Sequence, residues 1–221
     1  MKYYSTREIS ELAKQELPLT YGKIESKVEQ YHNAVFKEIL YGYYNHANMQ
    51  QIKNNEVPFS VSRMRKQLGR YGKPQRYWWD WLHANFPLVN IKSKGNSIQG
   101  VNSMAEPKDM ELKEILKRSN ATELLESIYS QYGDADIDIA PINMHSLENY
   151  VLATKAERNL NPTIQNNLLY AEKIFEMATI CKGKLPQVIS HSAFGRTYYR
   201  GLNLQNVHKT VRHAALGACY S

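Results

Sequence analysis

The chain has 221 residues, 43% of them hydrophobic, which is enough to bury a core and to form one domain or two. Its two cysteines, Cys181 and Cys219, lack partners at the spacing of a zinc site, so we expect free thiols in a reducing compartment. No apolar run approaches the roughly 18 residues that indicate a membrane span, and the N-terminal stretch MKYYSTREIS lacks the apolar segment of a signal peptide. Composition therefore disfavours a disulfide scaffold and predicts a cytoplasmic protein without membrane contact.

The formal net charge of +7 is unevenly distributed along the chain. Lys and Arg exceed Asp and Glu in residues 1–105 and again in residues 181–221, whereas the acids dominate residues 106–180. Two basic segments that flank an acidic one suggest separate surfaces, and the basic surfaces suit phosphate groups. Gly, Asn, Ser and Pro cluster where the sign first reverses. We therefore expect a first domain of residues 1–105 and a second of residues 106–221.

Two helices are expected at the N-terminus. Ser5 and Glu8 match a capping box for the first helix, which should end before Pro18. The second helix should cover residues 23–45, and Gly42 should mark where it frays or ends. Its core-facing residues are predicted to be Ile24, Val28, Tyr31, Val35 and Ile39. A short connecting strand is expected at residues 56–59.

Residues 59–104 predict two helices joined by a turn and followed by a β-hairpin. Ser60 can cap the first helix, whose apolar face is Val61, Met64 and Leu68. Gly69 and Gly72 allow a sharp turn, and Pro74 suits the first turn of the second helix. The residues of the second helix expected to face inward are Trp78, Trp81, Leu82 and Phe86. Strands at residues 88–91 and 98–104 should flank a basic tip of residues 92–96.

This order of elements resembles that of winged-helix DNA-binding domains, which present one helix to a DNA groove and a hairpin to the flanking backbone. Lys73, Gln75 and Arg76 would lie at the start of the second helix, where Arg and Gln side chains bond base edges. We expect them to share one electropositive surface with the wing. The predicted nucleic-acid-binding residues are Arg63, Arg65, Lys66, Arg70, Lys73, Gln75, Arg76, Lys92 and Lys94. The alternative is that the tryptophans fill a core and the arginines are only solvated.

Residues 106–180 predict an acidic helical unit. Helices are expected at residues 110–132, with a break near Ser119 and Asn120, and at residues 145–158 and 162–180. The fold class is therefore mainly α (α+β): an N-terminal winged helix-turn-helix with a β-hairpin wing, then a helical unit with a few short strands. We interpret the acidic unit as a scaffold that offers a surface for a protein partner or for oligomerisation.

Three aspartates, Asp134, Asp136 and Asp138, alternate in the sequence DADIDIAP. Alternate residues of a strand share a face, so these carboxylates could hold Mg²⁺ for phosphoryl chemistry. A solvated loop is the favoured interpretation. The histidines show no spacing typical of metal ligands. We predict no catalytic residue, no metal site and no cofactor.

The last forty residues contain no Asp or Glu. Strands are expected at residues 187–190 and 197–199, and a helix at residues 206–216. Lys209 and Arg212 would share one face of that helix, since they are three residues apart. Together with Arg196 and Arg200 they form a second predicted basic site, which suits a phosphate backbone or a nucleotide.

The run LPQV…GR-x-Y-x-x-G-L-x-L-Q-x-x-x-K-x-x-R in this segment resembles part of phage- and plasmid-borne replication or polymerase-like proteins. In that family the segment leads into a strand with a catalytic aspartate, whereas this chain stops at Tyr220 and Ser221. The resemblance therefore implies the N-terminal part of a longer replication protein, or a relative without the carboxylates that hold catalytic metal.

Three functions follow from these patterns. The favoured one is a DNA-binding protein of phage or plasmid replication type, whose winged helix contacts duplex DNA and which is the non-catalytic N-terminal part of a larger protein. The second is part of a metal-dependent nucleic-acid polymerase or processing enzyme, although an enzyme is disfavoured for this chain alone. The third is a non-enzymatic phage-type inhibitor or adaptor that binds an acidic protein surface.

Overall fold

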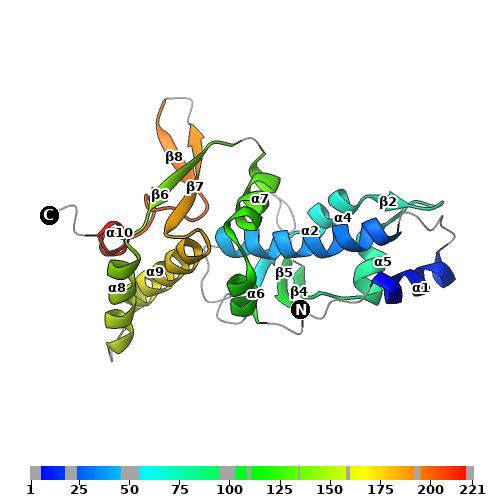
Figure 1. The fold of residues 1–221 in the computed structure, drawn as a ribbon, viewed down its shortest axis with the longest axis horizontal. Helices are drawn as coiled ribbons and strands as arrows, with labels where there is room; N and C mark the ends of the chain where they lie inside the picture. The colour runs from blue at the N-terminus through cyan, green and yellow to red at the C-terminus, as the bar shows by residue number, and fades with distance from the viewer. Residues whose placement is uncertain are drawn as a thin grey trace. The chain divides into compact units, whose positions relative to one another are not determined.

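The computed structural model describes residues 6–17, 24–45, 55–94, 103–108, 111–133, 135–157, 160–191 and 195–217. The fold is a mixture of α-helices and small antiparallel sheets, as the sequence predicts (Figure 1). The chain divides into two compact units. The first contains Met1–Tyr43 and Gln51–Ile115, and the second contains Tyr44–Gln50 and Leu116–Ser221. Among the described residues, no helix has both the length and the apolarity needed to cross a bilayer.

The first unit is built on one long helix, α2, which follows α1. All five residues expected on the core-facing side of α2 are buried. Because they recur at helical spacing, they form a continuous apolar stripe on which the other elements pack. The elements of the unit are α1 (Thr6–Glu16), α2 (Ile24–Asn45), β1 (Val57–Phe59), α4 (Val61–Leu68), β2 (Arg70–Tyr71), β3 (Arg76–Tyr77), α5 (Trp78–Asn85), β4 (Val89–Lys94) and β5 (Ser103–Pro107). Ser5 and Pro18, which we expected at the ends of α1, lie outside the described residues.

Gly42 lies within α2, which continues to Asn45, so the expectation that this glycine marks where the helix frays or ends is wrong. A Cβ atom at Gly42 would collide with the backbone carbonyl oxygen of Pro58 in β1. The glycine is therefore explained by the close approach of α2 to the neighbouring strand, not by a helix end.

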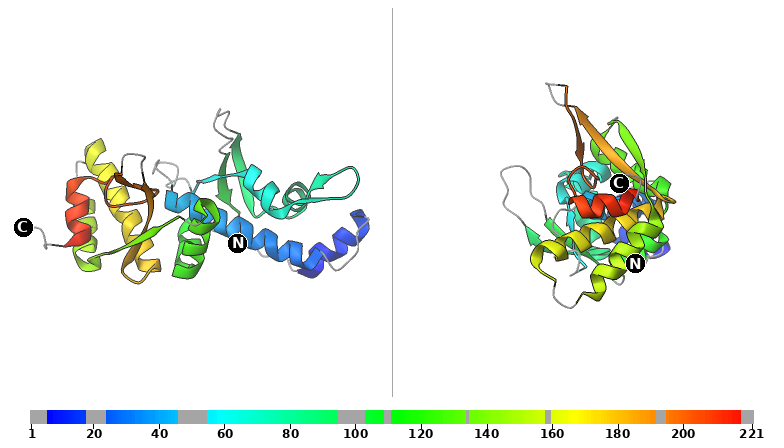
Figure 2. Two further views of the ribbon diagram at one scale, coloured as in Figure 1. Left: turned by 90° about the horizontal axis from the view of Figure 1, so that it is seen from above. Right: turned by 90° about the vertical axis from the view of Figure 1, so that its left-hand side faces the viewer.

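A three-stranded antiparallel sheet, in the order β1-β5-β4, completes this unit (Figure 2). Val57 pairs with Ala105 and Phe59 with Ser103, while Lys94 pairs with Ser103 from the other side. The connecting strand β1 is as expected. Both strands of the hairpin end further along the chain than predicted, β4 at Lys94 and β5 at Pro107, and the alternation of buried and half-buried residues in β5 continues to Pro107. Residues 95–102, which include the last two residues of the predicted tip and most of the predicted second strand, lie outside the described part.

The core of the first unit contains a cluster of aromatic rings around Trp79. The ring of Trp79 stacks on His83 at a centroid distance of 4.7 Å and lies 5.7 Å from Tyr31 and 5.5 Å from Phe59. Trp78, Leu82 and Phe86 are buried as predicted. Trp81, also predicted to face inward, is only half-buried, and its indole N–H donates to a carboxylate oxygen of Glu16 at 2.9 Å. The helix begins at Trp78 and its buried face passes through Trp79, so Trp81 falls at the edge of that face.

The second unit combines α-helices with a three-stranded antiparallel sheet in the order β6-β7-β8. The break expected near Ser119 is confirmed, since Asn120 caps a new helix through a reciprocal capping box with Glu123. The helices expected at residues 145–158 and 162–180 are also confirmed to within two residues at each end. The elements are α6 (Leu112–Arg118), which contains the boundary between the units, α7 (Ala121–Tyr132), β6 (Ile137–Pro141), α8 (Met144–Ala156), α9 (Pro162–Ile180), β7 (Lys184–His191), β8 (Thr197–Arg200) and α10 (Lys209–Leu216).

Helix α9 buries a lysine. The Lys173 side chain lies in the core-facing side of the helix and the residue is 1% exposed. Burial disfavours the charged ammonium group and lowers the pKa of Lys173 from 10.5 to about 7. Between these two values the unfolded chain binds a proton that the folded chain has released, so the free energy of unfolding rises with pH.

We predict that Lys173→Met removes this pH dependence. The variant should be more stable than the wild type at pH 7, where the buried amine still carries charge, and the difference should shrink toward pH 10. The difference in the free energy of unfolding between the two proteins should change by about 1.4 kcal/mol per pH unit in the range where the native amine is neutral and the unfolded amine is charged. Urea denaturation of both proteins at several pH values measures it. A difference that stays constant with pH would show that the amine is not desolvated.

We also predict that Trp79→Ala destabilises the chain much more than Trp81→Ala. Removing a fully buried tryptophan should cost about 3–5 kcal/mol because it leaves a cavity among the other rings. Trp81 has part of its surface in water, so its removal should cost clearly less. Denaturation midpoints of the two variants provide the comparison, and equal losses would contradict the placement of Trp81 at the edge of the core.

Candidate nucleic-acid interface

The sequence between α4 and α5 forms a small β-hairpin. Arg70 pairs with Tyr77 and Tyr71 with Arg76, and Gly72, with φ of +70°, begins the turn that joins the two strands. The ring of Tyr71 lies 4.7 Å from that of Trp78, which attaches the hairpin to the start of α5. The left view of Figure 2 shows this hairpin, coloured cyan, extending away from α4.

The expectation that Lys73, Gln75 and Arg76 occupy the first turn of a helix is therefore wrong. Lys73 and Gln75 lie in the turn of the hairpin and Arg76 lies in β3, all of them exposed. Pro74 also lies in this turn and does not start the helix, which begins at Trp78. The helix has the sequence WWDWLHAN and contains no Lys or Arg. The segment is held as a hairpin by cross-strand pairing and by the contact of Tyr71 with Trp78, and neither interaction is visible in the local sequence pattern.

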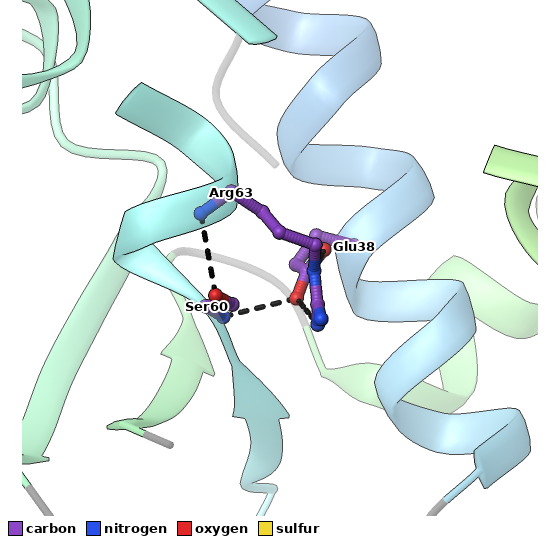
Figure 3. A network of polar contacts seen from close by, with 3 residues as sticks. All are labelled: Glu38, Ser60 and Arg63. Carbon is purple, nitrogen blue, oxygen red and sulfur yellow. Dashed lines mark hydrogen bonds and ion pairs between the residues drawn. The ribbon is translucent and has the colours of Figure 1, made fainter. Parts of the chain in front are cut away.

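Arg63, one of the predicted nucleic-acid ligands, is bound within the protein (Figure 3). Its guanidinium donates two hydrogen bonds to the carboxylate of Glu38, from Nη2 to Oε1 at 2.5 Å and from Nε to Oε2 at 3.1 Å. Glu38 comes from α2 and is 1% exposed. The backbone N–H of Ser60 donates to the same carboxylate at 2.9 Å, and the Ser60 hydroxyl accepts from the backbone N–H of Arg63 at 3.3 Å. Arg63 thus neutralises a buried acid, and this is its structural role.

Two further predicted ligands, Arg65 and Arg70, lie over the ring of Tyr77. Their guanidinium carbons are 5.3 and 4.7 Å from the ring centroid. Arg65 also forms an ion pair with Asp80 at 2.9 Å, and Arg70 donates to the side-chain oxygen of Gln75 at 3.0 Å. Both arginines are exposed. Because exposed ion pairs contribute little, these contacts position the guanidinium groups and leave them able to exchange partners with a ligand.

Lys66, Lys73 and Arg76 are the predicted ligands that remain uncompensated. All three are exposed, and none of their side chains has a hydrogen bond or an ion pair within the described part of the chain. Lys66 is on α4, and the other two are on the β2–β3 hairpin. A fully hydrated cation keeps its charge available for an anionic partner.

A hollow of about 680 Å³ lies between α4 and the β2–β3 hairpin. It brings together three cationic side chains from these two elements with an aromatic ring. Its lining residues are Val61, Ser62, Arg65, Lys66, Gly69, Arg70, Tyr77 and Ser103. Because Ser103 pairs with Lys94, the end of strand β4 lies at the edge of this hollow.

The two lysines predicted at the tip of the wing belong to strand β4 itself, so their assignment to the turn is wrong. Lys92 forms ion pairs with Glu106 at 2.9 Å and with Glu56 at 3.2 Å. The hydrogen bonds to Glu106 and Glu56 raise the pKa of the Lys92 ammonium. Two carboxylates thus offset its charge, and it contributes little to an electropositive surface. The side chain of Lys94 lies outside the described part.

The second predicted basic site is divided between two elements. Arg196 and Arg200 lie just before and at the end of β8, and both are exposed; Lys209 begins α10 and is exposed as well. Arg212 has a different role, because its guanidinium donates to the backbone carbonyls of Leu204, Gln205 and Val207 at 2.9, 3.0 and 3.2 Å. Arg212 therefore holds the loop before α10 and is not available as a phosphate ligand in this arrangement.

Two of the three alternating aspartates have protein partners. Asp138 accepts a hydrogen bond from the hydroxyl of Tyr199 at 3.0 Å, and Asp136 lies 3.8 Å from His191. Asp134 lies outside the described residues. Within the described ranges, no three His, Cys, Asp or Glu side chains gather in a way that could hold a metal ion.

Sequence reasoning missed the two features that organise this surface. Glu38 lies among apolar residues of α2, seven positions after Tyr31 and three after Val35, so its burial could have been found from the helical spacing. The hollow around Tyr77 depends on the β2–β3 hairpin, which the pattern of residues did not predict. No protein-family model, curated protein or solved structure matches this chain.

We predict that Arg63→Ala and Arg65→Ala differ strongly in stability, although each removes one arginine from α4. Loss of Arg63 deprives a buried carboxylate of its charged partner and should cost about 2–3 kcal/mol, below the roughly 3–5 of a fully buried pair, because the Arg63 side chain is 38% exposed. Loss of Arg65 breaks an exposed pair and should cost about 0–1 kcal/mol. Urea denaturation measures both values. Similar losses would show that Glu38 does not depend on Arg63.

Proposed function

We propose that the first unit binds duplex DNA through the surface formed by α4 and the β2–β3 hairpin. The observation that carries this proposal is the grouping of uncompensated cations there: Lys66, Lys73 and Arg76 are exposed and unpaired within the described residues. Arg65 and Arg70 add two exposed guanidinium groups held by weak contacts. Phosphate neutralisation by such cations supplies most of the affinity of a protein for duplex DNA.

The order of elements supports a winged-helix domain. Helix α2, strand β1, helices α4 and α5 and the hairpin β4–β5 follow one another, and β1 pairs with the second strand of that hairpin. The β2–β3 hairpin replaces the simple turn expected between the second and third helices of such a domain. Because α5 carries no Lys or Arg, we assign the contacts with DNA to α4 and the hairpin and not to the third helix.

The hairpin offers a route to sequence recognition. The major groove of B-DNA admits a two-stranded β-ribbon, and Arg and Gln side chains can each bond a base edge in two places. Gln75 and Arg76 lie side by side at the end of the hairpin and are exposed. In this proposal they contact bases, while Lys66 and Lys73 contact phosphates. The resemblance of the C-terminal segment to phage and plasmid replication proteins supports placing this binding in replication.

We predict that the double variant Lys73→Ala and Arg76→Ala weakens duplex binding and lowers its salt dependence. Each lost phosphate contact should reduce the slope of log K against log salt concentration by about 0.9. Fluorescence anisotropy with a labelled random-sequence duplex at three salt concentrations measures both effects. The matched control is the double variant Arg118→Ala and Lys184→Ala, which removes the same charge from exposed positions in the second unit.

Selection of bound sequences from a random duplex library completes the test. A consensus that weakens with Arg76→Ala alone would support base contacts by the hairpin. Equal losses in the test and control variants would indicate attraction by net charge only. Unchanged binding in the Lys73 and Arg76 variant would overturn the proposed surface.

A further inference from the structure

The second unit presents its own hairpin, formed by β7 and β8. Strand β8 lies at the edge of the sheet, with His191 paired to Thr197 and Val188 to Arg200. In Figure 1 this hairpin, coloured orange, projects beyond the helices α8, α9 and α10 of its own unit. Among the described residues, no further strand pairs with the outer edge of β8. The side chains of β8 form one row on each face of the sheet.

The two tyrosines of β8 have different environments. The hydroxyl of Tyr199 donates to Asp138 of β6 at 3.0 Å, which attaches one face of β8 to the rest of the sheet. This hydrogen bond to a carboxylate raises the pKa of Tyr199. Successive side chains of a strand point to opposite faces, so Tyr198 and Arg200 share the other face. Tyr198 is 47% exposed and Arg200 is exposed.

The charges of the hairpin are separated between its faces. Asp138 lies on the face with Tyr199, to which it is bonded, and Asp136 is near His191, which shares that face by the strand alternation. No acidic residue follows Glu176 in the sequence. The face of Tyr198 therefore has Arg200 as its ionic neighbour within the strand, and Arg196 is exposed two positions before Tyr198.

We propose that this face binds single-stranded nucleic acid, with the ring of Tyr198 stacked on an unpaired base and Arg200 at the adjacent phosphate. An exposed aromatic ring next to a cation is the combination by which proteins bind single strands without sequence preference, because every base has a flat face. A duplex does not offer this contact, since its bases are already stacked on one another. The site goes beyond the duplex-binding surface of the first unit and does not depend on it.

The site is tested by anisotropy titrations of the full chain with a fluorescein-labelled oligo(dT), with oligo(rU) in parallel to distinguish DNA from RNA. The background is the Lys73→Ala and Arg76→Ala variant, so that the cations of the first unit do not dominate the measurement. Tyr198→Ala should weaken binding by roughly fivefold to 150-fold, the range for loss of one stacked base. Tyr198→Phe should bind like the parent, because phenylalanine keeps the ring.

The chain offers a matched control in Tyr129 of α7, which is 47% exposed, the same as Tyr198. Tyr129→Ala should leave binding unchanged. Arg200→Ala should reduce the slope of log K against log salt by about 0.7, the value for one phosphate contact with a single strand. Tyr198→Ala should leave this slope unchanged, because stacking releases no counterions. The two substitutions thus separate the two parts of the proposed contact.

Replacement of the bases of the oligonucleotide by abasic sites provides the decisive comparison. For the parent protein, removing the bases should weaken binding by the same factor as Tyr198→Ala weakens binding to the normal strand. For Tyr198→Ala, removing the bases should cause no further loss of affinity. The proposal is overturned if Tyr198→Ala behaves like Tyr129→Ala, if no single strand binds, or if Tyr198→Ala weakens duplex and single strand equally. Thermal melting of each variant, expected to match the parent, excludes unfolding as the cause of any loss.

Discussion

The first unit depends on a carboxylate that is buried inside it. Glu38 projects from α2 where only apolar neighbours would be expected, and a charge in that position is costly unless it is paired and hydrogen-bonded. Ser60 and Arg63 provide those partners from one turn of chain, the first as a backbone donor and the second as a cation. The same serine caps α4. The requirement to neutralise Glu38 therefore fixes where α4 begins and how it is rotated about its axis, and this rotation decides that Arg65 and Lys66 line the hollow.

The positively charged side chains fall into two groups, which composition cannot separate: those paired within the protein and those left exposed without a partner in the described residues. Arg63 and Arg212 are bound by protein oxygen atoms, and Lys92 is held by two carboxylates. Arginine suits such structural tasks because its planar group carries five donors in a fixed geometry. Lys66 and Lys73, by contrast, have no partner in the described residues. In the first unit, the surface available to an anionic ligand is thus smaller than the charge of the segment suggests, and it includes the β2–β3 hairpin and α4.

Local patterns in the sequence predicted most of the helices but not the geometry of the candidate site. The apolar spacing of α2, the cap at Ser60 and the break before Asn120 are local properties, and the structure confirms all three. The hairpin β2–β3 was missed because Pro74, two residues after Gly72, suits either the start of a helix or a turn. The choice is made by the contact of Tyr71 with Trp78 and by pairing across the strands, which a local pattern does not contain. The same error shifted the phase of α5 and exchanged the roles of Trp79 and Trp81.

Both units carry a hairpin rich in arginine and tyrosine, but one tyrosine ring contacts cations whereas the other is exposed to solvent. The ring of Tyr77 has the guanidinium groups of Arg65 and Arg70 within 5.3 and 4.7 Å of its centroid, so it is already engaged with cations that can meet phosphates. The ring of Tyr198 has nearly half of its residue surface in water, while the neighbouring Tyr199 attaches the strand to the sheet. If both proposals hold, the kind of nucleic acid that each hairpin accepts follows from whether its tyrosine ring is occupied, and not from the number of its charges. Identical residue types can then select a paired backbone in one unit and an unpaired base in the other.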